Sequence, residues 1–165
     1  KSYRNTVEIS EFAQGILQHG AFFSYPIEPI IRHGNPVCVE KCGSEEKLIC
    51  RMAEKILSWQ QDGYDTVAVV CRTAAEAEDM AEKLGSRIQI EESSLEKAEF
   101  GQGVLVLPVE YTKGLEFDAV LICNPTKEDY PKDDGHAKLL YVAATRALHE
   151  LAVLHLGDVT ELMED

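Results

Sequence analysis

The sequence is poor in positive charge. Its 165 residues hold 16 lysines and arginines against 29 aspartates and glutamates, which gives a formal net charge of −13. A protein that binds nucleic acid on its own usually carries a basic surplus, so this balance argues against a free-standing nucleic-acid binder. Two stretches hold most of the excess: residues 74–100 carry eight acids and three bases, and residues 150–165 carry five acids and no lysine or arginine. We expect a solvated helix face and an acidic tail there.

Membrane spans, targeting segments and metal motifs are also missing. No apolar run approaches the ~20 residues of a transmembrane helix, and the polar opening KSYRNT does not resemble a signal peptide. The five cysteines are an odd number without a CxxC pair, which argues against a disulfide framework and against a zinc site. Cys71 and Cys123 lie in apolar runs and are expected to be small buried residues. We therefore expect a cytoplasmic protein with no metal site and no membrane contact.

The chain lacks a phosphate-binding loop as well. Neither GxxxxGK[ST] nor GxGxxG occurs, and the stretches GSEEK and GQGVL do not have the required glycine and lysine pattern at a strand-to-helix turn. Nothing in the sequence can therefore hold the phosphates of a nucleotide unaided.

The apolar pattern predicts an α/β fold in which strands alternate with helices. Helices are predicted over residues 7–17, 45–63, 74–85 and 136–149, with a short one capped by Asp158, and strands over residues 36–41, 65–72, 87–92, 103–109, 118–125 and 150–157. Thr73 and Glu76 fit a capping box at the third helix. Strands that are apolar throughout indicate an open, mainly parallel sheet with helices on both faces. Such sheets bind ligands at the carboxyl ends of their strands, so chemistry is expected there.

Three short motifs carry a resemblance to a known family. SYRNT (2–6), YTKGLEFDAVLI (111–122) and LLYVAATRALHEL (139–151) resemble, in this order, motifs IV, V and VI of the C-terminal motor domain of UvrD/Rep-type superfamily 1 helicases. The strand-end arginine and helix of CRTAAEAEDMAEKL (71–84) are similar to that family's pattern between motifs IV and V. The resemblance implies a single RecA-like domain over residues 1–165, the second of two motor domains. The first domain, with the phosphate loop, would lie outside this chain.

The resemblance also implies which residues contact ATP. In a two-domain motor the second domain supplies cations to the γ-phosphate, because negative charge builds up on the phosphoryl oxygens in the transition state. Arg146 and Arg4 match the family's two γ-phosphate arginines, with Arg146, late in its predicted helix, the better candidate for the arginine finger. Glu116 matches the acceptor for the ribose hydroxyls, and Tyr3 matches the aromatic residue that stacks on adenine. Gly114 is expected to let the backbone turn closely.

Cofactors and partners follow from the same resemblance. Thr112 and Lys113 are expected near the nucleotide or the nucleic-acid backbone. ATP and Mg²⁺ are the implied cofactors, both requiring the N-terminal domain, and single-stranded DNA and that domain are the implied partners. The chain alone is therefore expected to show no ATPase activity.

Two departures from the family pattern leave alternatives open. Glu110 stands where helicases usually have a histidine that helps contact single-stranded nucleic acid, and an acid would repel phosphates there. The region between motifs IV and V is also too short for a large inserted domain. Both features are closer to the HelD/helicase IV-like branch, some of whose members use ATP to release RNA polymerase from nucleic acid. A DNA helicase or translocase, a HelD-like remodeller of RNA polymerase and a non-catalytic α/β module all remain open, although the intact Arg4, Glu116 and Arg146 argue against the last.

Overall fold

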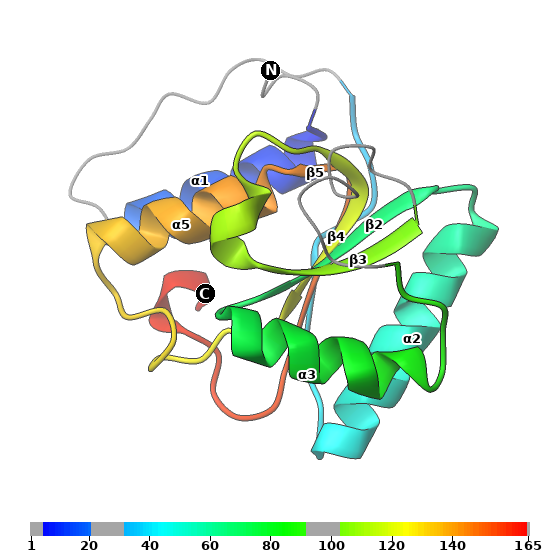
Figure 1. The fold of residues 1–165 in the computed structure, drawn as a ribbon. Coiled ribbons are helices and arrows are strands. Elements are labelled where there is room, and N and C mark those ends of the chain that lie inside the picture. The colour runs from blue at the N-terminus through cyan, green and yellow to red at the C-terminus, as the bar shows by residue number, and fades with distance from the viewer. Residues whose placement is uncertain (1–4, 21–31, 92–102, 165) are drawn as a thin grey trace.

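A computed structural model describes residues 5–20, 32–91 and 103–164 of the chain (Figure 1). Within these residues five strands form one sheet in the order β1-β5-β4-β2-β3, and every pairing is parallel. The strands are β1 (Cys38–Lys41), β2 (Thr66–Cys71), β3 (Gly103–Pro108), β4 (Phe117–Cys123) and β5 (Ala147–His155). The helices are α1 (Val7–Gly20), α2 (Glu45–Gln61), α3 (Ala74–Gly85) and α5 (Asp134–Ala144), with the 3-10 helices η2 (Val109–Thr112) and η3 (Glu161–Met163). The predicted open parallel α/β sheet is confirmed.

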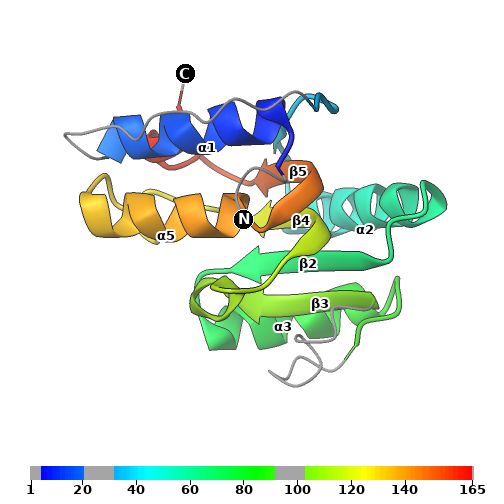
Figure 2. The ribbon, with the colours of Figure 1, turned by 90° about the horizontal axis from the view of Figure 1, so that it is seen from above.

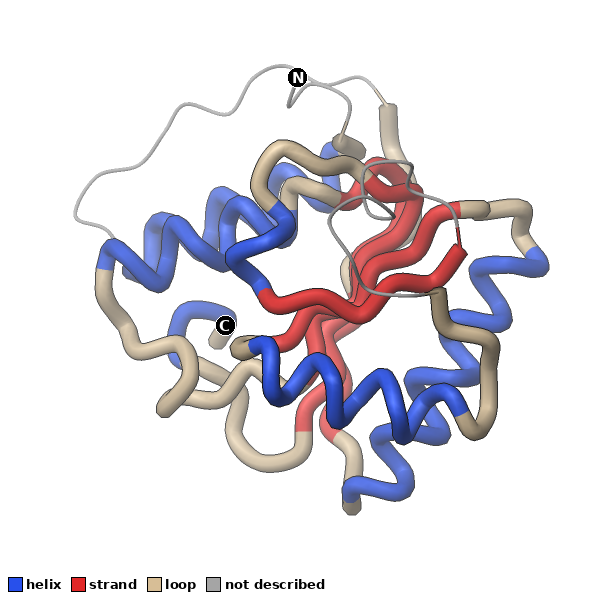
Figure 3. The backbone as a smooth tube through the Cα atoms, viewed as in Figure 1, coloured by secondary structure: helices blue, strands red, loops and turns tan. Residues whose placement is uncertain are grey.

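Helices cover both faces of this sheet and divide the core in two. Helices α1 and α5 lie side by side on one face, and α2 and α3 cover the other (Figures 2 and 3). The central strands are buried on both faces, which explains why their sequences are apolar without alternation. No helix among those described is long and apolar enough to cross a membrane.

The N-terminal caps of two helices follow the sequence pattern. The Ser44 hydroxyl accepts a hydrogen bond from the Lys47 N–H at α2, and the Thr73 hydroxyl accepts one from the Glu76 N–H at 3.1 Å at α3. The return bond of the capping box differs, because the Glu76 carboxylate accepts from the backbone N–H of Arg72 at 3.2 Å. The helix starts predicted at these two places are confirmed.

One predicted strand, one helix end and one helix cap are wrong. Residues 87–91 form no strand: the Arg87 and Ile88 N–H groups donate back to the Leu84 carbonyl, and the Glu91 N–H donates to the Val104 carbonyl. The helix predicted over 136–149 ends at Ala144, and residues 147–155 are a strand instead. An apolar run such as ALHELAVLH is compatible with a helix or with a buried strand. Parallel pairing with β1 on one side and β4 on the other makes it a central strand. Asp158 is not a cap, because the Thr160 hydroxyl takes that place at η3.

Candidate functional site

Arg146 lies in the turn between α5 and β5, not within a helix as predicted. Its Nε donates to the Val142 carbonyl at 2.9 Å, Nη1 to the Leu115 carbonyl at 3.3 Å, and Nη2 to the Thr145 hydroxyl at 3.3 Å. The carbonyl of Val142 is at the C-terminal end of α5, where carbonyls lack partners within the helix. All three acceptors are neutral, so they orient the guanidinium without cancelling its positive charge.

Partial burial sets the electrostatics of Arg146. Removal from water lowers the pKa of the Arg146 guanidinium from its usual value, while the nearby charge of Glu116 acts in the opposite direction. An arginine stays protonated in spite of such a shift. A half-desolvated cation attracts an approaching anion more strongly than a fully hydrated one does, because less water screens the pair.

The loop between β3 and β4 brings Gly114 and Glu116 close to Arg146. The Leu115 carbonyl between them accepts the bond from Arg146, and the Phe117 N–H that follows them donates to the Arg146 carbonyl at 2.9 Å. Gly114 has φ +81°, in the left-handed region, and a Cβ there would meet no atom within 4 Å. Backbone conformation, not crowding, therefore explains this glycine. Glu116 is exposed directly before β4.

The two candidates for nucleic-acid contact on this loop differ in exposure. Lys113 is exposed, whereas Thr112 is fully buried. The Thr112 hydroxyl donates to the Val109 carbonyl at 2.8 Å and so holds the turn of η2. In this arrangement the Lys113 side chain is accessible to a ligand, whereas Thr112 stabilises the conformation of the loop.

Asn5 joins the first motif to the third. Its amide nitrogen donates to the Thr145 carbonyl at 3.0 Å and to the Ala147 carbonyl at 2.6 Å, so it bridges the residues on either side of Arg146. Asn5 is 2% exposed, and 140 residues separate it from Thr145. Sequence reasoning did not single it out, and its place inside SYRNT was the available signal. The candidates Tyr3 and Arg4 lie outside the described residues.

The described candidates Gly114, Glu116 and Arg146 gather at the amino edge of the sheet. Arg146 directly precedes β5 and Glu116 directly precedes β4, whose first residues Ala147 and Phe117 are paired. We expected chemistry at the carboxyl ends of the strands, whereas these two candidates lie at the amino edge. Parallel strands explain the result, because each connection must return the chain to the amino edge before the next strand starts.

Glu110 is at the opposite edge and has a partner. Its Oε2 accepts from Nη1 of Arg72 at 2.8 Å. Arg72 follows β2, and its Nε also donates to the Asp129 carbonyl at 2.9 Å while its guanidinium lies 5.7 Å from the centre of the Tyr130 ring. The acid that departs from the family pattern thus takes part in an ion pair that joins η2 to the end of β2.

Comparisons of the fold and of the sequence with known proteins both lead to helicase C-terminal domains. The fold is that of the RecA-like C-terminal domains of helicases. Residues 103–154, which include the whole of the two later motifs, match the family model of the UvrD-like helicase C-terminal domain.

Two solved structures are similar to the chain. The C-terminal domain of a possible DNA helicase from Lactobacillus plantarum WCFS1 has a TM-score of 0.81 and 28% sequence identity, over 99% of this chain and 92% of that one. The C-terminal domain of the DEAD-box protein Dbp5 has a TM-score of 0.52 and 12% identity, over 74% of this chain and 77% of that one, and shares the fold alone. No curated protein sequence matches the chain.

Proposed function

We propose that this chain is the second motor domain of an ATP-dependent DNA helicase or translocase. ATP would bind between it and an N-terminal domain that carries the phosphate loop. The observation that carries the proposal is the setting of Arg146, which three neutral acceptors orient at the amino edge beside Gly114 and Glu116. The match of residues 103–154 to UvrD-like domains supports it.

Arg146 would act as the arginine finger. Hydrolysis of ATP builds negative charge on the γ-phosphoryl oxygens, and a guanidinium stabilises that charge through a planar fork of N–H donors. Its three hydrogen-bond acceptors are neutral, so none of them cancels the positive charge that Arg146 would offer to the phosphate. Arg4, next in sequence to the buried Asn5, would supply the second cation.

The remaining candidates would hold the nucleotide and the nucleic acid. Glu116 would accept from the ribose hydroxyls, since a carboxylate suits a diol and repels phosphate. Tyr3 would stack on the adenine, and exposed Lys113 would contact a phosphate backbone. ATP hydrolysis would need Mg²⁺, but no group of three or more His, Cys, Asp or Glu in the part of the chain described could hold a metal ion. We therefore assign its ligands to the N-terminal domain.

The test is ATP hydrolysis by the full-length protein. Arg146→Ala should lower kcat by about 10³-fold or more, the range measured for arginine fingers, with little change in nucleotide affinity. Arg87→Ala, at an exposed arginine outside the site, is the matched control and should hydrolyse ATP normally. Near-normal hydrolysis by Arg146→Ala would refute the proposal.

A HelD-like ATPase that remodels RNA polymerase is the second candidate. Glu110 favours it, because its carboxylate is paired with Arg72 where helicases usually have a histidine that contacts nucleic acid. Strand separation with DNA-stimulated ATPase activity by the full-length protein would support the helicase. Co-purification with RNA polymerase without unwinding would support the HelD-like function.

A further inference from the structure

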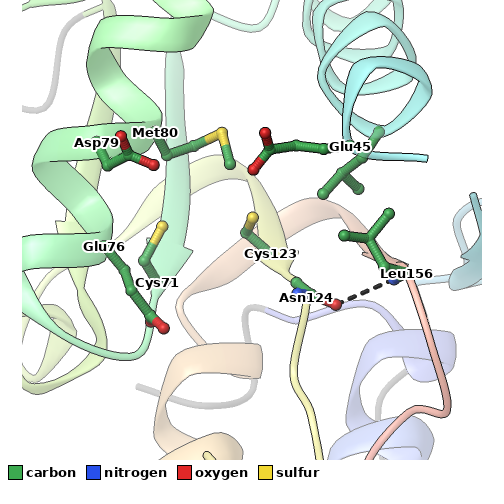
Figure 4. Close-up of a pocket in the computed structure, with 9 residues that line it drawn as sticks. Glu45, Cys71, Glu76, Asp79, Met80, Cys123, Asn124 and Leu156 are labelled. Atoms are coloured by element: carbon green, nitrogen blue, oxygen red, sulfur yellow. Dashed lines mark hydrogen bonds between the residues drawn. The ribbon is translucent and has the colours of Figure 1, made fainter.

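A cavity of about 220 Å³ opens at the carboxyl edge of the sheet, between α2 and α3 (Figure 4). Cys71, the last residue of β2, and Cys123, the last residue of β4, both line it. The described candidates for ATP contact, Glu116 and Arg146, lie at the opposite, amino edge and do not line this cavity. Open α/β sheets usually bind ligands at the carboxyl edge, so the cavity needs its own explanation.

The two cysteines lie next to each other. Val70 pairs with Ile122 in parallel register, and the next residue on each strand is a cysteine. Cys71 is 3% exposed and Cys123 is 7% exposed, both on the face covered by α2 and α3. Figure 4 shows both sulfur atoms directed toward the space beside Met80 and Glu45. A hydrogen bond to Cys123 and burial raise the pKa of the Cys71 thiol.

A third sulfur atom lies beside this pair. The Sδ of Met52, from α2, is 3.9 Å from the Sγ of Cys123. The two thiols therefore line the cavity, and the thioether of fully buried Met52 lies next to the Cys123 thiol without lining the cavity itself. Sulfur ligands of this kind select soft ions such as Cu(I) over Mg²⁺ and Ca²⁺.

The charge around the cavity favours a cation. Glu45, Glu76 and Asp79 line it. The Lys83 ammonium is 2.9 Å from the Glu45 carboxylate and 2.8 Å from that of Asp79. Three carboxylates against one ammonium leave a negative potential, which repels phosphates and attracts metal ions.

We propose that Cys71, Cys123 and Met52 form a binding site for one Cu(I) ion. Each thiol would release its proton to water as its sulfur–copper bond forms, the thioether would donate a lone pair, and copper would remain Cu(I). Zinc fits less well, because a four-coordinate site needs more Cys, His or carboxylate donors than converge at any point of the described chain.

The test uses the reduced 165-residue chain without oxygen, titrated with Cu(I) against a chromophoric Cu(I) chelator. Cys38→Ser and Cys50→Ser are included as background, because these two thiols are only partly buried. The variant with Cys38→Ser and Cys50→Ser should withhold one Cu(I) ion from the chelator. Adding Cys71→Ser or Cys123→Ser should abolish retention. Adding Cys42→Ser, at another buried cysteine on the same face, should leave it unchanged. Retention that survives the loss of both Cys71 and Cys123 would overturn the site.

A second measurement needs no substitution. The chain has three methionines, and ¹³C-methyl labelling reports on each by NMR. Cu(I) should shift the Met52 methyl resonance and leave that of Met163, in the core beneath the other face, in place. Copper retention without a shift at Met52, or no retention at all, would overturn the proposal. Neither outcome bears on ATP hydrolysis, so this site can fail while the proposed function stands.

Discussion

Asn5 is the single side chain that best explains how Arg146 is held. Both hydrogens of its amide group are used, on the carbonyls that precede and follow the arginine in the turn. Since Asn5 is 2% exposed, water cannot replace these bonds when the amide is removed. The residue therefore couples the stability of the domain to the geometry of the candidate arginine finger.

Replacing Asn5 should be costly. Asn5→Ala leaves two buried carbonyls without donors, and we expect the free energy of unfolding to fall by about 2–4 kcal/mol. Urea denaturation of the chain measures this. Ser86→Ala is the control: the exposed Ser86 hydroxyl donates to the Lys83 carbonyl at 2.9 Å, where water can replace the bond, and should contribute far less. Equal losses for the two variants would contradict the bridging role of Asn5.

Glu8 should give the stability of the chain a dependence on pH. Hydrogen bonds from His33 and the Gly34 N–H lower the pKa of this carboxyl group from 4.5 to about 2. A carboxyl group whose pKa is lower when folded stabilises the fold above its unfolded pKa and loses that effect as the pH falls through the folded value.

We predict that replacing Glu8 changes how the free energy of unfolding depends on pH. Glu8→Gln should be less stable than the natural chain near neutral pH, and the gap should close as the pH falls from about 4.5 toward about 2. Glu11→Gln, on the same helix, is the control. Urea unfolding over this range measures both, and a gap that is independent of pH would contradict the assignment.

At the scale of elements, Arg72 joins the end of β2 to η2 and to the segment before α5. Its partners are the Glu110 carboxylate, the Asp129 carbonyl and the Tyr130 ring. The η2 segment leads to Gly114 and Glu116, and the segment with Asp129 leads through α5 to Arg146. Arg72 therefore holds the starting points of both candidate segments.

A double-mutant cycle tests this link. Arg72→Met and Glu110→Gln should each destabilise the chain, with a coupling energy of at most about 1 kcal/mol. The limit follows from exposure, because 23% of the Arg72 side chain and 53% of the Glu110 side chain are exposed and water screens the pair. The coupling should shrink at high salt, where charges are screened. Additive effects in urea unfolding would show that the ion pair does not stabilise the loop.

Helices and strands could be predicted from the sequence where the local residue pattern favours the same structure as the packing around it. Strands β2, β3 and β4 were found because burial on both faces makes their sequences continuously apolar, and α3 because Thr73 marks its start. The boundary at residues 144–147 was missed because the run around Arg146 has no breaker such as glycine or proline. Pairing of Ala147 with Phe117 decides it, and that contact is not local.

At the scale of the whole molecule, the chain holds only part of the proposed ATP site. We expect the isolated chain to unfold cooperatively but to show no ATPase activity and only weak ATP affinity, because it has no phosphate-binding loop. Phosphate release by the purified chain, with an Arg146→Ala preparation to reveal contaminants, measures this. Turnover that the variant lacks would contradict the prediction.

The sequence by itself determined the fold class and the identity of the candidate residues. Both follow from local information: runs of apolar residues specify buried parallel strands, and three short motifs carry the family resemblance. Tertiary structure alone decided that the residues gather at the amino edge, that Asn5 bridges the turn of Arg146, and that Glu110 pairs with Arg72. These contacts depend on the strand order β1-β5-β4-β2-β3, which brings together segments up to 142 residues apart and which no local periodicity encodes.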